Sequence, residues 1–210
     1  MGYTDESGVT IPPLHPRCRC AIIYDEVAAP RVKPRGLAAG NIDIATAEGS
    51  SPKLIGKLEK VTPTTIQKTL EYYELQIVKS SVEHAVIITA TGEIWHCSGD
   101  VHSIPMRYFE QMRRELEGAY VTHNHPPAAK ENEHTFSDDD FNNFKNFKMA
   151  RLRGIEERFL YELNQNLEDN ELAGYSLPEI YSLGLDFSDY HYAIMLKALS
   201  NGLGYWRVKR

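Results

Sequence analysis

His123 and His125 are the residues whose types and spacing are best suited to chemistry, and they follow a short run at 119–122 that we expect to be a buried strand. Alternate residues of an extended segment point to the same side, so the two imidazoles can converge on one ion. Asp140 lies in the first turn of an expected helix, where its carboxylate can reach back as a third ligand. Two imidazoles and one carboxylate suit zinc, and three protein ligands leave a fourth position for water. The spacing therefore predicts a Zn²⁺ site formed by His123, His125 and Asp140.

The same residues form a motif. His-x-His-Pro, from His123 to Pro126, is followed by Ser-x-x-Asp, from Ser137 to Asp140, and this pattern resembles the JAMM motif of the JAB/MPN metalloprotease family. RadC proteins of bacteria share the motif, and the local sequence is most similar to JAB domains of phage and polymorphic-toxin proteins. The resemblance covers roughly residues 60–208. It implies a zinc-dependent hydrolase of peptide or isopeptide bonds, acting on a protein or peptide substrate. It also implies the family's α/β fold, a deaminase-like sandwich in which a mixed sheet is flanked by helices.

The resemblance also assigns roles to two further residues. A glutamate at the mouth of the first core strand is the general base of the family, and Glu83 stands in the matching place, just before the apolar run at 85–90. Glu93 is a competing acid, but it belongs to the expected return strand beyond a turn. Ser137 matches the serine that hydrogen-bonds the developing oxyanion in the family. We therefore expect Glu83 and Ser137 to be catalytic.

Each of these features also has a simpler interpretation. Ser137 followed by Asp140 is a helix capping box, and Glu83 is also readable as an ordinary exposed acid at a strand end. The insert at 127–136 is longer than the corresponding loop of similar proteins, which leaves the geometry between the two halves of the motif open. His134 within this insert is either a competing ligand or a solvated loop histidine.

Two other enzyme classes fit the sequence less well than a hydrolase does. A cytidine deaminase would share the fold type and a zinc ion, but the chain lacks its His-x-Glu and Pro-Cys-x-x-Cys motifs. An HNH nuclease spreads its three named residues over a ββα unit, whereas His123, Asn124 and His125 are contiguous. Two alternatives stay open: a non-catalytic phage structural or interaction module with a JAB fold, and a toxin effector domain.

Composition places the chain among ordinary globular proteins. Of its 210 residues, 42% are hydrophobic and 25% charged, and the net charge of −6 argues against binding to nucleic acid. No stretch approaches the ~18 consecutive apolar residues of a membrane span, so we expect no membrane partner. Three cysteines do not make a disulfide framework. We expect the protein in a bacterial host cytoplasm or a phage virion, and its oligomeric state is left open.

The N-terminal part carries a second resemblance. Residues 11–20 read Ile-Pro-Pro-Leu-His-Pro-Arg-Cys-Arg-Cys, and the prolines predict an extended segment. The string resembles the C-terminal signature of phage Mu F-type minor head (head morphogenesis) proteins, which implies a phage or prophage origin and phage structural proteins as candidate partners. His15, Cys18 and Cys20 could hold a second zinc ion, although a fourth ligand is not evident, and reduced thiols in an ordered tail are the alternative. We divide the chain into three parts: a head-protein remnant and extended tail at 1–25, a linker at 26–57, and a JAB/MPN-like domain at 58–210.

Periodicity and turn residues predict the elements of this domain. We expect Asn124 to face away from the ligands because strand alternation sends it to the opposite side, and His84 or Asn124 to tune the surroundings of the site. The expected helices lie at 63–77, 106–116, 138–152 and 189–201, and the expected strands at 85–90, 93–96, 119–122, 155–163 and 205–208.

Overall fold

The computed structural model describes residues 3–4, 10–11, 49–126 and 134–210, and the chain divides into two compact units, Met1–Val32 and Lys33–Arg210. In the first unit, β1 (Tyr3–Thr4) pairs antiparallel with β2 (Thr10–Ile11). His15, Cys18 and Cys20 lie outside the described residues, so the second zinc site stays a prediction.

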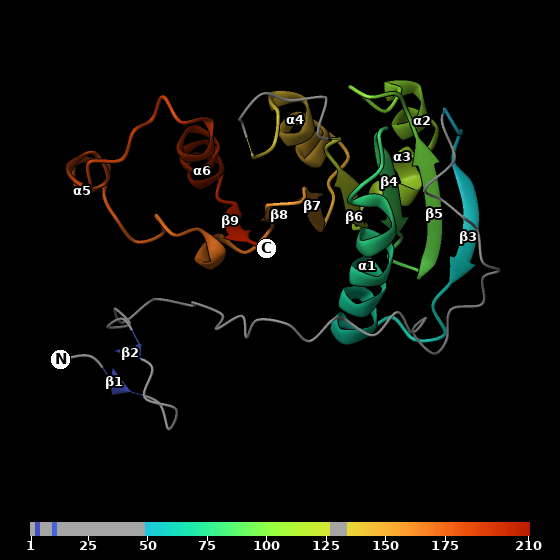
Figure 1. Ribbon diagram of the computed structural model, residues 1–210, viewed down its shortest axis with the longest axis horizontal. Helices are drawn as coiled ribbons and strands as arrows, with labels where there is room; N and C mark the ends of the chain where they lie inside the picture. The colour runs from blue at the N-terminus through green and yellow to red at the C-terminus, as the bar shows by residue number, and fades with distance from the viewer. Residues whose placement is uncertain (1–2, 5–9, 12–48, 127–133) are drawn as a thin grey trace. The chain divides into compact units, whose positions relative to one another are not determined.

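The second unit is built on a seven-stranded mixed sheet with the order β3-β5-β4-β6-β7-β8-β9 (Figure 1). Neighbouring strands are antiparallel throughout, except that β6 and β7 run parallel. This sheet and its helices confirm the predicted mixed α/β class. The strands are β3 (Lys53–Lys57), β4 (His84–Ile88), β5 (Glu93–Ser98), β6 (Tyr120–Asn124), β7 (Arg151–Ile155), β8 (Phe159–Asn164) and β9 (Gly204–Lys209).

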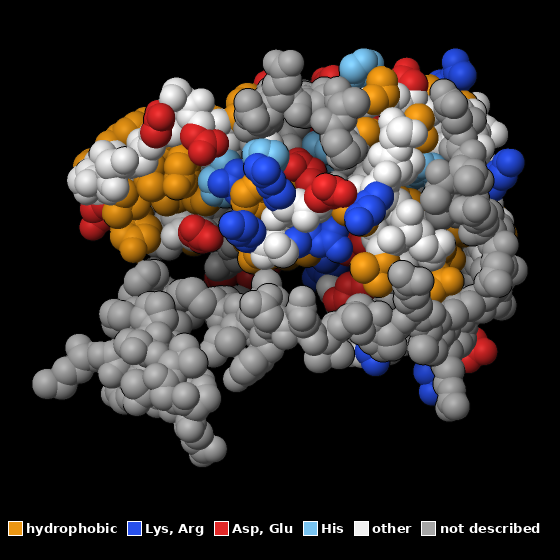
Figure 2. Space-filling model, in the orientation of Figure 1, with side chains coloured by type: hydrophobic (Ala, Val, Ile, Leu, Met, Phe, Trp, Pro, Cys, Tyr) orange, Lys and Arg blue, Asp and Glu red, His pale blue; other side chains and the backbone are white. Residues whose placement is uncertain are grey.

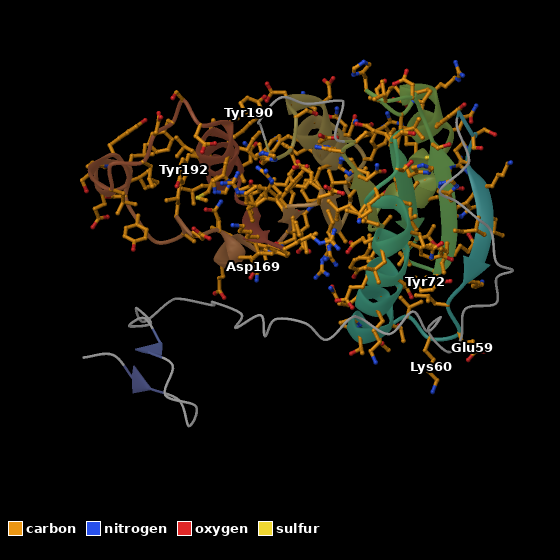
Figure 3. The ribbon with its side chains drawn as sticks, viewed as in Figure 1. Glu59, Lys60, Tyr72, Asp169, Tyr190 and Tyr192 are labelled. Carbon is orange, nitrogen blue, oxygen red and sulfur yellow. The ribbon has the colours of Figure 1, made fainter. Side chains whose placement is uncertain are left out.

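Helices flank the sheet on both faces. One face, here called the α1 face, is covered by α1 (Pro63–Ile77), and the other, here called the site face, packs against the remaining helices (Figure 1). Tyr72 of α1 and the pair Tyr190 and Tyr192 of α6 come from opposite layers (Figure 3). The helices of the site face are α2 (Met106–Gln111), α3 (Arg113–Leu116), α4 (Asp138–Asn146), α5 (Leu177–Ser182) and α6 (Tyr190–Ser200). A 3-10 turn, η2 (Leu167–Asp169), follows β8 in the chain.

Helix α1 forms where the sequence predicts it. The Thr62 hydroxyl accepts a hydrogen bond from the Thr65 backbone N–H at 3.1 Å, and Pro63 fills the first helical turn, where its missing N–H costs nothing. Ile66 and Leu70 are buried one turn apart and pack with strand residues of the α1 face. Within the described ranges, no helix is both long and apolar enough to cross a membrane.

The start of the sheet corrects the predicted linker at 26–57. Residues Lys53–Lys57 form β3, which pairs antiparallel with β5, and Ile55 is buried. The short segment has a charged residue at each end, and its strand conformation depends on the hydrogen bonds that β5 supplies. The residue pattern of this segment alone therefore does not predict a strand.

The region after α4 corrects two further predictions. The helix expected at 138–152 ends at Asn146, because Lys148 adopts a left-handed conformation with φ of 51°. Residues 151 and 152 of the expected helix belong to β7, which also contains Gly154. The single strand expected at 155–163 is instead the hairpin of β7 and β8. Because β7 is buried on both faces, it lacks the alternation that marks a half-exposed strand.

The C-terminal elements leave apolar surface exposed. Hydrophobic side chains gather over α5 (Figure 2), where Tyr175, Leu177, Tyr181 and Leu183 are between 45% and 64% exposed. Ile180 of the same helix is fully buried and belongs to the core of the site face. Helix α5 is thus anchored by one side while its other side faces outward.

Candidate metal centre

Strand β6 and helix α4 bring the three expected ligands together. Nε2 of His123 and Nε2 of His125 lie 2.9 Å apart. One Asp140 oxygen lies 3.4 Å from His123 Nε2, and the other lies 3.7 Å from His125 Nε2. All three ligand atoms fall within 4.8 Å of one another, and both histidines are buried. His134, the competing ligand, is not part of this group.

The capping box of α4 fixes the carboxylate. Ser137 caps the helix: its hydroxyl accepts a hydrogen bond from the Asp140 backbone N–H at 3.1 Å. The Asp140 carboxylate in turn accepts hydrogen bonds from the Ser137 hydroxyl at 2.7 Å and from the Ser137 backbone N–H at 2.9 Å. The simpler interpretation of Ser137 and Asp140 as a capping pair is therefore realised. The same cap orients Asp140 toward the histidines, so its role in the cap is compatible with the predicted role as a ligand.

Charge couples the three groups. Burial by itself lowers the pKa of His123, but the adjacent Asp140 carboxylate, with help from Glu83, raises this pKa above its usual value. Burial by itself raises the pKa of Asp140, yet His123 and His125 hold it well below its ordinary range. The carboxylate thus stays ionised between two imidazoles, as a ligand for a cation must.

Glu83 lies at the same end of the sheet, just before β4. Ala85 pairs with His123 across β4 and β6, so strand alternation places Glu83, Ala85 and His123 on the site face. The Glu83 backbone is held on both sides: its N–H donates to the Asp100 carbonyl at 2.7 Å, and its carbonyl accepts from Gly99 at 2.8 Å. Glu93, the competing acid, is the first residue of β5 and lies beside the opposite end of β4, where its N–H donates to the Thr89 hydroxyl.

A cavity of about 350 Å³ opens beside these residues. Its polar wall includes Glu83 and the three candidate ligands, while apolar side chains, among them those of Phe109, Met149 and Leu152, line another part. A pocket with one apolar wall and a few convergent polar groups is the usual form of a small-molecule or peptide site.

Asn124 faces away from the ligands, as predicted. Its side chain donates to the Val82 carbonyl at 3.0 Å and accepts from the His84 N–H at 2.8 Å. The His84 side chain also points away from the ligands: its ring nitrogens bond to the Ser80 hydroxyl at 2.8 Å and to His96 Nε2 at 3.0 Å. Asn124 therefore fixes the segment that carries Glu83, whereas the His84 ring does not reach the site.

Two residues in contact with the site, Tyr161 and Glu156, were not predicted from the sequence. The Tyr161 hydroxyl lies 2.6 Å from His125 Nδ1 and donates to Glu156 at 2.9 Å. The Glu156 carboxylate also forms a hydrogen bond with His134, which holds that histidine beside Glu156. The available signal was the placement of Tyr161 on one face of an expected strand, but its neighbouring strand was not foreseen.

No protein-family model, curated protein or solved structure matched this chain.

Proposed function

We propose that this chain is a zinc-dependent hydrolase of peptide or isopeptide bonds, with a JAB/MPN arrangement and a JAMM-type site. One observation carries the proposal: two imidazole nitrogens and a carboxylate converge at the wall of a cavity that also receives Glu83. Three ligands, an acid on the same face and room for a substrate are what metal-assisted hydrolysis requires.

The donor set fits zinc. Two ligand atoms bound to one tetrahedral zinc ion at the usual bond lengths lie about 3.3 Å apart. The two Nε2 atoms lie 2.9 Å apart, and each lies 3.4 or 3.7 Å from a different Asp140 oxygen. With one ligand atom per residue, the three atoms lie within 4.8 Å of one another, which is close enough for a small shift to bring them to one ion. Nitrogen and carboxylate donors together favour zinc over calcium or magnesium, which prefer oxygen alone.

When bound, zinc would supply Lewis acidity, making water a better nucleophile near neutral pH and polarising the substrate carbonyl. Glu83 takes the proton of the attacking water as its oxygen forms the new bond to the carbonyl carbon. Glu83 then passes that proton to the leaving amine as the C–N bond breaks. The products are a carboxylic acid and an amine, and Glu83 returns to its starting state.

Ser137 has a positioning role in this scheme. Its hydroxyl hydrogen is directed at Asp140, at 2.7 Å, and one hydrogen cannot serve the carboxylate and an oxyanion at the same time. Ser137 therefore holds Asp140 in place before substrate enters. Its action on the oxyanion, which the family resemblance implies, stays a prediction.

The test is cleavage by the zinc-loaded protein. A mixture of peptides, with and without lysine-branched isopeptide bonds, is incubated with wild type, Glu83→Gln and Glu93→Gln. Mass spectrometry then counts the new α-amino termini that peptide cleavage releases and the new lysine ε-amines that isopeptide cleavage releases. We expect Glu83→Gln to lose roughly 10²- to 10⁴-fold in rate, the usual contribution of a general base, and Glu93→Gln to match wild type. Equal cleavage by the two variants contradicts the assigned base. No cleavage by zinc-loaded wild type favours the non-catalytic interaction module.

A further inference from the structure

A chain of hydrogen bonds leads away from His125 on the side opposite the candidate metal position. His125 Nδ1 lies 2.6 Å from the Tyr161 hydroxyl, which donates to one Glu156 oxygen at 2.9 Å. The other Glu156 oxygen bonds to His134 Nδ1. Both Glu156 oxygens therefore have partners, and the carboxylate is held from two directions.

The fold makes a specific place for the Tyr161 ring. Tyr161 on β8 pairs with Gly154 on β7, and Gly154 pairs with His123 on β6. A Cβ added at Gly154 would lie 2.0 Å from Cε2 of the ring. The ring thus crosses β7 at the one position without a side chain, which lets its hydroxyl reach a histidine two strands away.

The direction of the hydrogen bonds follows from their chemistry. A carboxylate can only accept, so the single hydroxyl hydrogen of Tyr161 goes to Glu156. The tyrosine oxygen is then left as an acceptor, and the contact with His125 needs a hydrogen on Nδ1. A neutral imidazole with its hydrogen on Nδ1 carries its lone pair on Nε2. That nitrogen is the one directed at His123 and Asp140.

We propose that Tyr161 and Glu156 are positioning residues that hold His125 in its Nδ1–H tautomer and present Nε2 to the metal. The tautomer itself depends only on the hydrogen-bond chain, whereas its consequence for zinc rests on the proposed function. Hydrogen-bonded partners of this kind typically change metal affinity by about 10- to 100-fold.

Tyr205 provides a matched control. It is fully buried like Tyr161, lies on the same face of the sheet, and its hydroxyl also contacts a histidine Nδ1, that of His191, at 2.8 Å. Its second partner is the Thr135 hydroxyl at 2.7 Å, and it does not contact a candidate ligand. Tyr161→Phe and Tyr205→Phe therefore remove equivalent buried hydroxyl groups, and only the first breaks the chain to His125.

The experiment has two readouts. Side-chain ¹⁵N NMR of the metal-free protein, at about pH 8.5 and so above the usual histidine pKa of roughly 6.5, reports which His125 nitrogen carries hydrogen. We expect Nδ1–H in wild type and Tyr205→Phe, and a shift toward Nε2–H in Tyr161→Phe and in Glu156→Leu, which removes the acceptor of the Tyr161 hydroxyl. Competition with a chromophoric chelator then measures zinc affinity. We expect this affinity to fall about 10- to 100-fold in Tyr161→Phe and to stay near wild type in Tyr205→Phe.

The outcomes separate the two proposals. Nε2–H in wild-type His125 overturns the positioning role, whether or not zinc binds. If wild type binds zinc, equal zinc affinities for Tyr161→Phe and Tyr205→Phe overturn it as well. If wild type binds no zinc but shows Nδ1–H, lost in Tyr161→Phe, the hydrogen-bond chain is supported and the proposed hydrolase is contradicted. Glu156→Leu keeps the Tyr161 side chain and removes only its acceptor, so the test survives if Tyr161→Phe does not fold.

Discussion

Asn124 accepts a hydrogen bond from the backbone N–H of His84 at 2.8 Å. The same side chain donates to the Val82 carbonyl at 3.0 Å, so one amide spans the backbone on both sides of Glu83. Asn124 lies between the two candidate histidine ligands. Strand β6, which carries His123, therefore also fixes the proposed general base, through a side chain that turns away from the site.

Asn124→Ala should separate positioning of Glu83 from metal binding. The change leaves a buried N–H and a buried carbonyl without their partner, which costs about 1–3 kcal/mol of stability. We expect zinc affinity to stay near wild type and the rate of peptide cleavage to fall, because Glu83 is less well fixed. Asn170→Ala is the control, since Asn170 is equally buried and also bonds to backbone, at Met195 and Leu172. Similar loss of activity in both variants would show only general destabilisation.

Gly154→Ala should destabilise the protein through a clash with one ring. The new methyl group would lie 2.0 Å from Tyr161, and overpacking of this kind costs about 1–3 kcal/mol or more. Denaturant unfolding of Gly154→Ala, Tyr161→Ala and the double variant forms a cycle. We expect the methyl group to cost much less once the ring is gone. Additive losses would mean that the ring does not need the space above Gly154.

Stability should fall in acid because buried histidines stay neutral in the fold, among them the contacting pair His84 and His96. Burial lowers the pKa of both His84 and His96 to about 4, and the charges of His84 and Lys53 add to the effect at His96. The unfolded chain, with histidine pKa values near 6.5, binds more protons between these values. The contribution is therefore complete above about pH 6.5 and is lost as the pH falls toward about 4.

The variant His96→Gln tests this pH dependence. Glutamine takes up no proton in this range, so we expect its urea midpoint to change less than that of wild type between about pH 6.5 and pH 4.5. His102→Gln, at an exposed histidine, is the control and should follow wild type. If the urea midpoint of His96→Gln depends on pH as steeply as that of wild type, the buried pair is not the source of the pH dependence.

The candidate ligands could be predicted from sequence because local rules place them. Strand alternation sets His123 and His125 on one side, and a capping box aims Asp140 back from the first turn of α4. Glu83 could be preferred to Glu93 from its place before the strand, and the two acids do lie at opposite ends of β4. Each of these inferences uses residues close together in the chain.

Tyr161 and Glu156 could not be found in this way. Their contact with His125 depends on the parallel register of β6 with β7, and on a gap above Gly154 that exists only once β8 is paired. β3 shows the same limit, because its pairing with β5 determines its structure more than its own pattern does. Pairing between strands that are far apart in the sequence determines these features, and the periodicity of one segment does not predict that pairing.

Zinc content per chain, measured by elemental analysis, tests the central claim most directly. The samples are wild type, His123→Ala/His125→Ala and Cys18→Ser/Cys20→Ser, each purified without chelators and then offered zinc. We expect about one zinc in wild type and in the cysteine variant, and none in the histidine variant, because the site needs both imidazoles. No zinc in reconstituted wild type, or zinc that persists without the histidines and disappears with the cysteines, would contradict the proposed centre.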